Sequence, residues 1–298
     1  MLLNEAWQLI RQTAADWVED NAAQLGAALA FFSVLSLAPL LIIVIAIAGA
    51  VFGAEAARGE IVSQIDGMVG HDGAQVIQDI LAHAGKPAEG ALATALGIVT
   101  LLFGAAGVFG QLQTALNIIW EVRPSPRWVR GFFIARLLSF AMVLGTGFLL
   151  LALLALGALL RAVMEFTNDR LPGSDFVWIA ANSIASFGLI TLLFALVFKL
   201  IPDAKVHWKD VWPGATLTAI LFTVGKFLLG LYLSSSGLGS AYGAAGSLVV
   251  LVAWVYYSAL VLFFGAEFTH VYAQRYGAQI VPVEGAVHVT EGDNTTRN

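Results

Sequence analysis

The chain contains no cysteine and carries little charge. Without cysteine it cannot form a disulfide, a thiolate metal site or a cysteine nucleophile. Only 12% of its 298 residues are charged and 59% are hydrophobic, whereas about a quarter of the residues in an ordinary soluble domain are charged. A water-soluble globule of this size has too few interior positions to hide so much apolar surface. The composition therefore excludes a soluble enzyme and a disordered chain, and it predicts a multi-span membrane protein.

Excess positive charge and the common catalytic motifs are also missing. The net charge is −5, so no overall basic field exists to hold nucleic acid. The sequence has no P-loop, dinucleotide fingerprint, Ser-His-Asp grouping, HExxH or GxSxG motif. It predicts no catalytic residue, no cofactor and no metal. The first apolar run follows an acidic stretch, so we do not expect a cleaved signal peptide.

Long uncharged runs predict an all-α polytopic membrane protein. A helix needs about 20 apolar residues to cross roughly 30 Å of hydrocarbon, and runs that are apolar on all faces favour helices over barrel strands. The six predicted spans are 27–52, 91–112, 137–160, 177–199, 212–233 and 247–267. They form one domain over 1–276, and the polar cytoplasmic tail at 277–298 is expected to be disordered.

Lysine and arginine in the connections predict the orientation. With the N-terminus inside, ten of these residues lie in the inner connections and adjacent helix ends, and four lie in the outer ones. Basic residues concentrate on the cytoplasmic side of membrane proteins. We therefore expect both termini in the cytoplasm, in a cell inner membrane.

Two predicted helical segments do not span the membrane. Residues 4–20 form an amphipathic helix that either lies at the inner interface or packs on the bundle. Residues 53–90 suggest an outer helical hairpin around the turn at 70–73. The hairpin is either a lid over a cavity or a structural cap.

Lys226 is the most unusual residue because it lies inside a predicted span. A charge at the bilayer centre costs at least about 2.5–3.5 kcal/mol. Lys226 either lines a polar cavity and attracts an anionic group, or extends its stem to the outer interface. Pro39 should kink the first span. The candidate substrate-binding residues are Lys226, Ser33, Ser36, Pro39, Asn182 and Ser186.

Several charged residues lie near the predicted inner boundary. We interpret four of them as structural ion pairs that fix helix ends: Glu267, Arg136, Glu121 and Arg123. Asp203, His207 and Asp210 would share one face of a helix, and such side chains can bind a metal. The bases between them favour a solvated turn instead.

Several motifs resemble those of the YihY/BrkB family of bacterial inner-membrane proteins. They occur in the family's order: GAALAFFSVLSLAP at 26–39, ALNIIWE at 115–121, IPDAKV at 201–206, PGA at 213–215, YGAAGS at 242–247 and GAE at 265–267. The resemblance implies six spans and supplies no agreed catalytic residue. Some members carry the label ribonuclease BN, which is widely regarded as mistaken.

The resemblance and the residues together favour transport or handling of an envelope lipid or solute. The expected partners are the bilayer and an anionic lipid or small solute. Nucleic acid is not an expected partner, and the sequence leaves open whether the chain forms a homo-oligomer. A non-catalytic scaffold for envelope machinery is the alternative, and a membrane-attached ribonuclease is less favoured.

Overall fold

The fold is taken from a computed structural model of the chain. It describes residues 2–53, 107–124, 175–236, 246–278, 280–283 and 286–288, together with positions 55, 58, 59, 62, 63 and 78. The predicted span at 137–160 and most of the span at 91–112 lie outside these residues. So does nearly all of the predicted outer hairpin.

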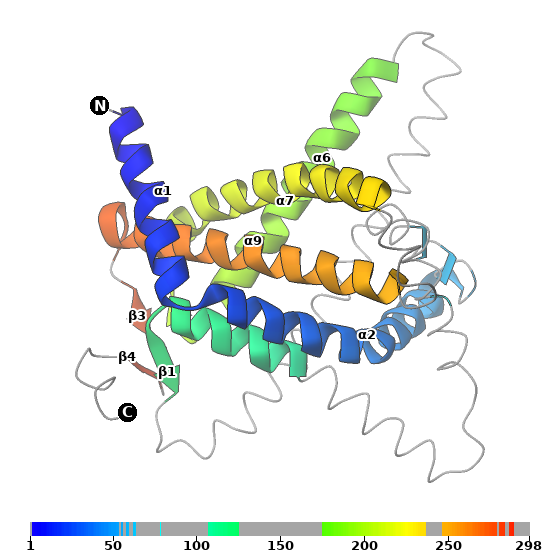
Figure 1. Cartoon of the computed structure of the whole chain (residues 1–298), viewed down its shortest axis with the longest axis horizontal. Coiled ribbons are helices and arrows are strands. Elements are labelled where there is room, and N and C mark those ends of the chain that lie inside the picture. The colour runs from blue at the N-terminus through cyan, green and yellow to red at the C-terminus, as the bar shows by residue number, and fades with distance from the viewer. Residues whose placement is uncertain are drawn as a thin grey trace.

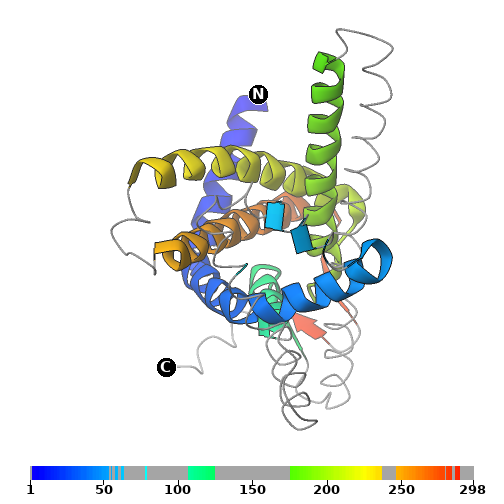
Figure 2. The same ribbon diagram turned by 90° about the vertical axis from the view of Figure 1, so that its right-hand side faces the viewer.

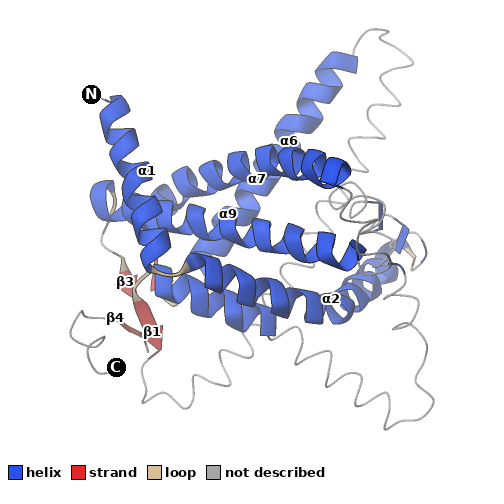
Figure 3. Cartoon of the chain, viewed as in Figure 1, coloured by secondary structure: helices blue, strands red, loops and turns tan. Residues whose placement is uncertain are grey.

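Long helices dominate the described part of the chain (Figures 1 and 3). They are α1 (Leu2–Glu19), α2 (Ala22–Phe52), an unlabelled helix at 107–119, α6 (Asp175–Leu200), α7 (Trp208–Ser236) and α9 (Gly246–Tyr276). Among the described residues, three segments are long and apolar enough to cross a membrane: Ser183–Leu200, Trp208–Leu229 and Leu248–Tyr276. They overlap the last three predicted spans, and α2 covers the first. The total of six spans stays a prediction.

Helix α9 lies between α7 and α2, and both views show this arrangement (Figures 1 and 2). Helix α6 packs on α7, and α1 packs on α9. The outer faces expose large apolar side chains, as expected for helices whose neighbours are lipid tails. Examples are Ile184, Val224, Phe227 and Leu228.

Helices α7 and α9 cross closely through two glycine–threonine contacts. A methyl group added at Gly214 would overlap Thr269 Oγ1, and one added at Gly265 would overlap Thr218 Oγ1. Each threonine hydroxyl donates to the glycine carbonyl four residues earlier in its own helix, at 2.7 Å. Because lipid provides no hydrophobic drive between helices, close backbone approach of this kind supplies the packing.

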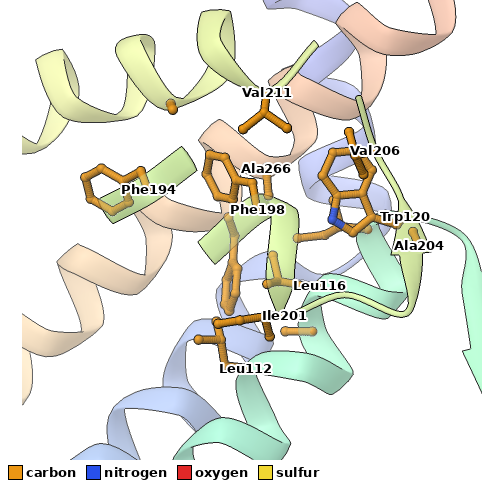
Figure 4. Packing of buried hydrophobic residues seen from close by; sticks show 14 of the residues in the cluster. Leu112, Leu116, Trp120, Phe194, Phe198, Ile201, Ala204, Val206, Val211 and Ala266 are labelled. Atoms are coloured by element: carbon orange, nitrogen blue, oxygen red, sulfur yellow. The ribbon is translucent and has the colours of Figure 1, made fainter. Parts of the chain in front are cut away.

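A hydrophobic core fills the end of the bundle near the strands (Figure 4). It is built from five helices and the loop after α6. Its buried members include Leu116, Trp120, Phe198, Ile201, Val206, Val211, Phe263 and Ala266. Phe194 and Phe198 stack with centroids 6.4 Å apart. This packing fixes the ends of the helices that carry the acidic residues described below.

The chain after α9 forms strands, which corrects the prediction of a disordered tail from residue 277. Strand β3 (Val281–Pro282) pairs antiparallel with β2 (Ala204–Lys205), and β4 (Ala286–His288) pairs antiparallel with β1 (Val122–Pro124). The loops before α7 and after 107–119 provide strand edges for the tail. Ile280 also packs on the core. Residues 289–298 lie outside the described part.

Asp203 ties three segments together at this end. Its carboxylate accepts hydrogen bonds from Asn117 Nδ2 at 2.8 Å and Gln113 Nε2 at 3.1 Å. Its backbone N–H donates to Asn117 Oδ1 at 2.8 Å, and its carbonyl accepts from the N–H of Val283. The IPDAKV motif therefore joins helix 107–119 to the C-terminal strands.

Replacing Asn117 with alanine should destabilise the fold by about 2–3 kcal/mol, because a half-buried carboxylate oxygen and an N–H of Asp203 lose their partner. Thermal unfolding of the purified protein measures the loss. Thr114→Ala is the matched control, since that exposed hydroxyl bonds only the Gly110 carbonyl within its own helix. An equal effect of both substitutions would contradict the role of Asp203.

Candidate functional site

The candidate site lies where α1 turns into α2, beside the last turns of α9 (Figure 1). The turn is only two residues long, Asp20 and Asn21. Asn21 adopts a left-handed conformation with φ 53°, which asparagine tolerates better than most residues. This tight reversal keeps Asp20 against α9.

One face of α1 packs on the bundle, and the opposite face is exposed. The packed face carries Leu9, Thr13, Asp16, Trp17 and Asp20, which recur at helical spacing. Trp7 and Val18 are exposed on the other face. Packing of residues 4–20 on the bundle is therefore confirmed, and their location at the membrane interface stays a prediction.

Helices α1 and α9 run antiparallel. Arg275 Nη2 donates to Gln8 Oε1 at 2.8 Å near one end of the contact, and the carboxyl groups of Asp20 and Glu267 meet at the other. Glu267 is fully buried, with 0% exposure. No hydrogen-bond donor among the described residues reaches either of its oxygens.

In the part of the chain that the structure describes, the charged groups that act on the Glu267 carboxyl are acids. They are Asp20, Asp16 and Glu121. Two carboxyl groups can form a hydrogen bond with each other only when one carries a proton. Arg136, a predicted partner of Glu267, lies outside the described residues, and Glu121 and Arg123 are exposed after helix 107–119. The ion pairs predicted for these residues therefore stay predictions.

Burial raises the pKa of Asp20 from 3.8 to about 6. Contact with Glu267 opposes this rise, and three further acids reinforce it: Glu121, Asp16 and Glu19. Burial and the charge of Glu19 also raise the pKa of Asp16. The turn between α1 and α2 therefore holds a carboxyl group whose pKa lies well above that of an ordinary aspartate.

Three other buried polar atoms near these helices lack a hydrogen-bond partner among the described residues: Thr13 Oγ1, Trp17 Nε1 and Trp120 Nε1. The ring of Trp120 meets His270 edge-on with centroids 5.6 Å apart, one turn beyond Glu267. The His270 ring also contacts Gln274 Nε2 at 2.9 Å. Polar groups that are buried and unpaired are uncommon in folded proteins, so their concentration here marks a site.

The sequence-predicted substrate residues occupy different surroundings. Lys226 is exposed on α7 beside exposed Phe227, whereas its neighbour Gly225 is closed in by Tyr257 of α9. Ser36 is buried and Ser33 half-buried in α2, and Ser186 is exposed on α6. Pro39 and Asn182 lie in helices, but their side chains are outside the described set. Binding by these six residues stays a prediction.

Within the described residues, no group of three histidine, aspartate or glutamate side chains is placed to hold a metal. Asp203 binds Asn117, and Asp210 accepts instead from the N–H of Ala278 at 3.3 Å. A pocket of about 320 Å³ lies in the predicted outer connection, and Arg58 and Gln78 are among its lining residues. An arginine and an amide suit an anionic group.

Asp20→Asn should stabilise the protein at neutral pH. Because its folded pKa exceeds 3.8, ionised Asp20 weakens the fold as the pH rises through the range from 3.8 to about 6. The full change corresponds to about 3 kcal/mol, and partial solvent exposure reduces the expected gain to about 1 kcal/mol. Unfolding curves at neutral and acidic pH measure it. A gain that does not shrink in acid would contradict this explanation.

Long apolar helices with large apolar side chains exposed on their outer faces define a polytopic helical membrane protein. Glu267 does not lie at a helix end as predicted, because α9 continues to Tyr276. The model of the family described as Virulence factor BrkB matches residues 13–286. The chain therefore belongs to the BrkB family, as its sequence motifs predict.

Curated relatives agree with this assignment. A UPF0761 membrane protein of Pseudoalteromonas translucida is 28% identical, over 88% of this chain and 83% of its own. Another from Vibrio atlanticus is 28% identical, over 97% of this chain and 88% of its own. A Bacillus subtilis protein named putative ribonuclease-like protein YfkH is 24% identical, over 81% of this chain and 86% of its own. No solved structure is significantly similar to the chain.

Proposed function

We propose that this protein transports or handles a lipid or small solute of the bacterial envelope. It does so from the inner membrane, with both termini in the cytoplasm. The observation that carries the proposal is the buried contact between Asp20 and Glu267 at one end of the bundle. Ionisable residues inside membrane helices are costly and commonly mark substrate or ion pathways.

A purely structural role explains this contact poorly. A hydrophobic pair of similar size at the same place would avoid the desolvation of two carboxyl groups and would often be more stable. The Gly–Thr crossing of α7 and α9 already holds the helices together without charge. We therefore favour a transporter over a scaffold. The few acids at this end gather in no metal-binding group of three among the described residues, which gives the ribonuclease alternative no support.

The substrate path would combine the buried acids with the residues predicted from the sequence. Lys226 and the polar residues around Pro39 are the candidates within the spans, and Arg58 offers a positive charge in the predicted outer connection. Together they suit a substrate with an anionic group, as lipid headgroups and many solutes have.

A complementation experiment tests the proposal. A strain lacking the gene is supplied with the wild type, Glu267→Gln, Lys226→Leu or the control Gly188→Ala, each at matched membrane levels. Untargeted mass spectrometry then compares lipid extracts with aqueous extracts of the cells. The wild type and the control should restore the same altered compounds, and the other two variants should not. The affected extract separates a lipid from a solute.

Full restoration by both Glu267→Gln and Lys226→Leu would contradict transport through these residues. Crosslinking that recovers one constant partner protein in the wild type and in both variants would then support the scaffold. Cleavage of transfer RNA by the purified protein, dependent on Mg²⁺, would instead support the ribonuclease.

A further inference from the structure

We propose that Asp20 and Glu267 together bind a proton from the cytoplasmic side, and that this proton is the coupling ion of the transporter. The inference deepens the proposed function and rests on it. It assigns to the end of the α1–α9 contact a ligand that the sequence alone does not indicate.

The geometry of the pair favours a proton as the ligand. Glu267 is fully buried, and neither of its oxygens has a donor among the described residues. Its direct neighbour is another carboxyl group, Asp20. Two carboxylates in contact repel each other, and in such pairs one proton is shared. A bound proton therefore provides the hydrogen bond that the protein itself does not offer.

A second set of observations is independent of the acids. The hydroxyl of Thr13 is completely buried on the α1 face that packs on α9, yet it has no partner among the described residues. Trp17 Nε1, one turn further along that face, and Trp120 Nε1 are also unpaired. Buried polar atoms of this kind are usually served by ordered water. Thr13 and Trp17 lie on the same face of α1 as Asp20, so water bound to them would lie along the α1–α9 contact that leads to the carboxyl pair.

The surrounding negative charges also favour a bound cation. From α1, Asp16 and Glu19 face the pair, and Glu121 faces it from the turn after helix 107–119. Helix α2 contains no charged residue. On α7, Asp210 lies beside Gly277, just beyond the last residue of α9, and Lys226 is exposed. On α9 itself, His270 is one turn away and contacts Trp120.

The two carboxyl groups differ in exposure, and this difference gives proton binding a direction. Asp20 is half-buried and lies on the side of the contact that is nearer to the protein surface. Glu267 is fully buried. A proton taken from solution would therefore reach Asp20 first and Glu267 second. Binding removes the repulsion between α1 and α9 at this point, and release restores it. The α1–α9 contact is thus the element whose spacing protonation would change.

Infrared spectroscopy of the purified full-length protein in lipid nanodiscs tests the proton site directly. Spectra recorded in acidic and alkaline buffers, in H₂O and D₂O, report the C=O stretch of protonated carboxyl groups. The wild type should show a deuterium-sensitive band that persists at neutral pH. Glu267→Gln and Asp20→Asn should each lose most of it. Glu5→Gln, which changes an exposed acid on α1, should retain it.

Three results would overturn the proton site: no such band in the wild type, an unchanged band in Glu267→Gln, or loss of the band when Na⁺ replaces choline at constant pH. The last result would make Na⁺ the ligand. The complementation experiment tests transport separately, because it does not depend on the identity of the ion. A confirmed band with full complementation by Glu267→Gln would show that the proton is bound but is not the coupling ion.

Discussion

Gly265→Val should prevent α7 and α9 from packing and should cost at least about 3 kcal/mol of stability. A side chain at this position overlaps Thr218 Oγ1, and the Cβ of Thr218 lies only 2.9 Å away. The two helices would have to separate, and both the core and the position of Glu267 depend on their contact. The expected result is a large fall in thermal stability and in the amount of protein in the membrane.

Three further variants test whether the close crossing causes this loss. Gly188→Ala places a methyl group where nothing lies within 4 Å, so it should leave stability unchanged or raise it by up to about 1 kcal/mol through helix propensity. Gly265→Ala should be destabilising, and adding Thr218→Ala should restore part of the loss by removing the nearest atom. Equal stability of Gly265→Val and Gly188→Ala would refute the close crossing.

Glu267→Gln should stabilise the protein while abolishing its activity. A buried carboxyl group among three other acids must either carry a proton or face strong repulsion. The amide keeps the shape, removes the charge and can donate to Asp20, so we expect a gain of about 1–3 kcal/mol at neutral pH. Stability gained at the expense of function is characteristic of a working site.

Thermal unfolding of the purified Glu267→Gln variant, together with complementation by the same variant in cells, distinguishes a functional role of Glu267 from a structural one. If Glu267 only fixed a helix end, the variant would lose stability and activity together, as Asn117→Ala is expected to do. Glu5→Gln serves as the surface control, with neither property changed. A stable Glu267→Gln variant with full activity would instead show that the buried charge is dispensable.

The sequence predicts the long helices well because their signal is local. A long apolar run such as 212–233, interrupted only by Lys226, has few alternatives to a membrane helix, and α7 forms there. The motif near residue 201 also identifies the family, but its chemistry becomes visible only with Asn117 placed beside Asp203. That contact joins residues 86 positions apart in the chain.

The candidate site could not be predicted in the same way. In the sequence, Asp20 is one of several acids before the first span, and Glu267 is interpreted as a charge at a helix end. Only the antiparallel packing of α1 on α9 brings the two carboxyl groups together. One signal was present: Thr13, Asp16 and Asp20 recur at helical spacing opposite the exposed Trp7. A polar stripe on the packed face of an amphipathic helix is the feature that could have revealed the site.

Two other features depend on contacts between distant segments and could not be predicted from the sequence: the glycine–threonine crossing and the C-terminal strands. Small residues within a helix do not specify which neighbour they contact, so the role of Gly214 and Gly265 needed the structure. The strands after α9 are two and three residues long, too short to carry a pattern of their own. They form because β1 and β2 present edges to them.

The central claim is that the Asp20–Glu267 pair lies at the cytoplasmic end of the bundle. The chain has no native cysteine, so single-cysteine variants at exposed positions test this directly: Glu5→Cys, Gln274→Cys and Glu55→Cys. A membrane-impermeant maleimide should label the first two only in inside-out vesicles and the third in intact spheroplasts. Labelling of positions 5 and 274 from opposite sides, or of either from outside, would contradict it.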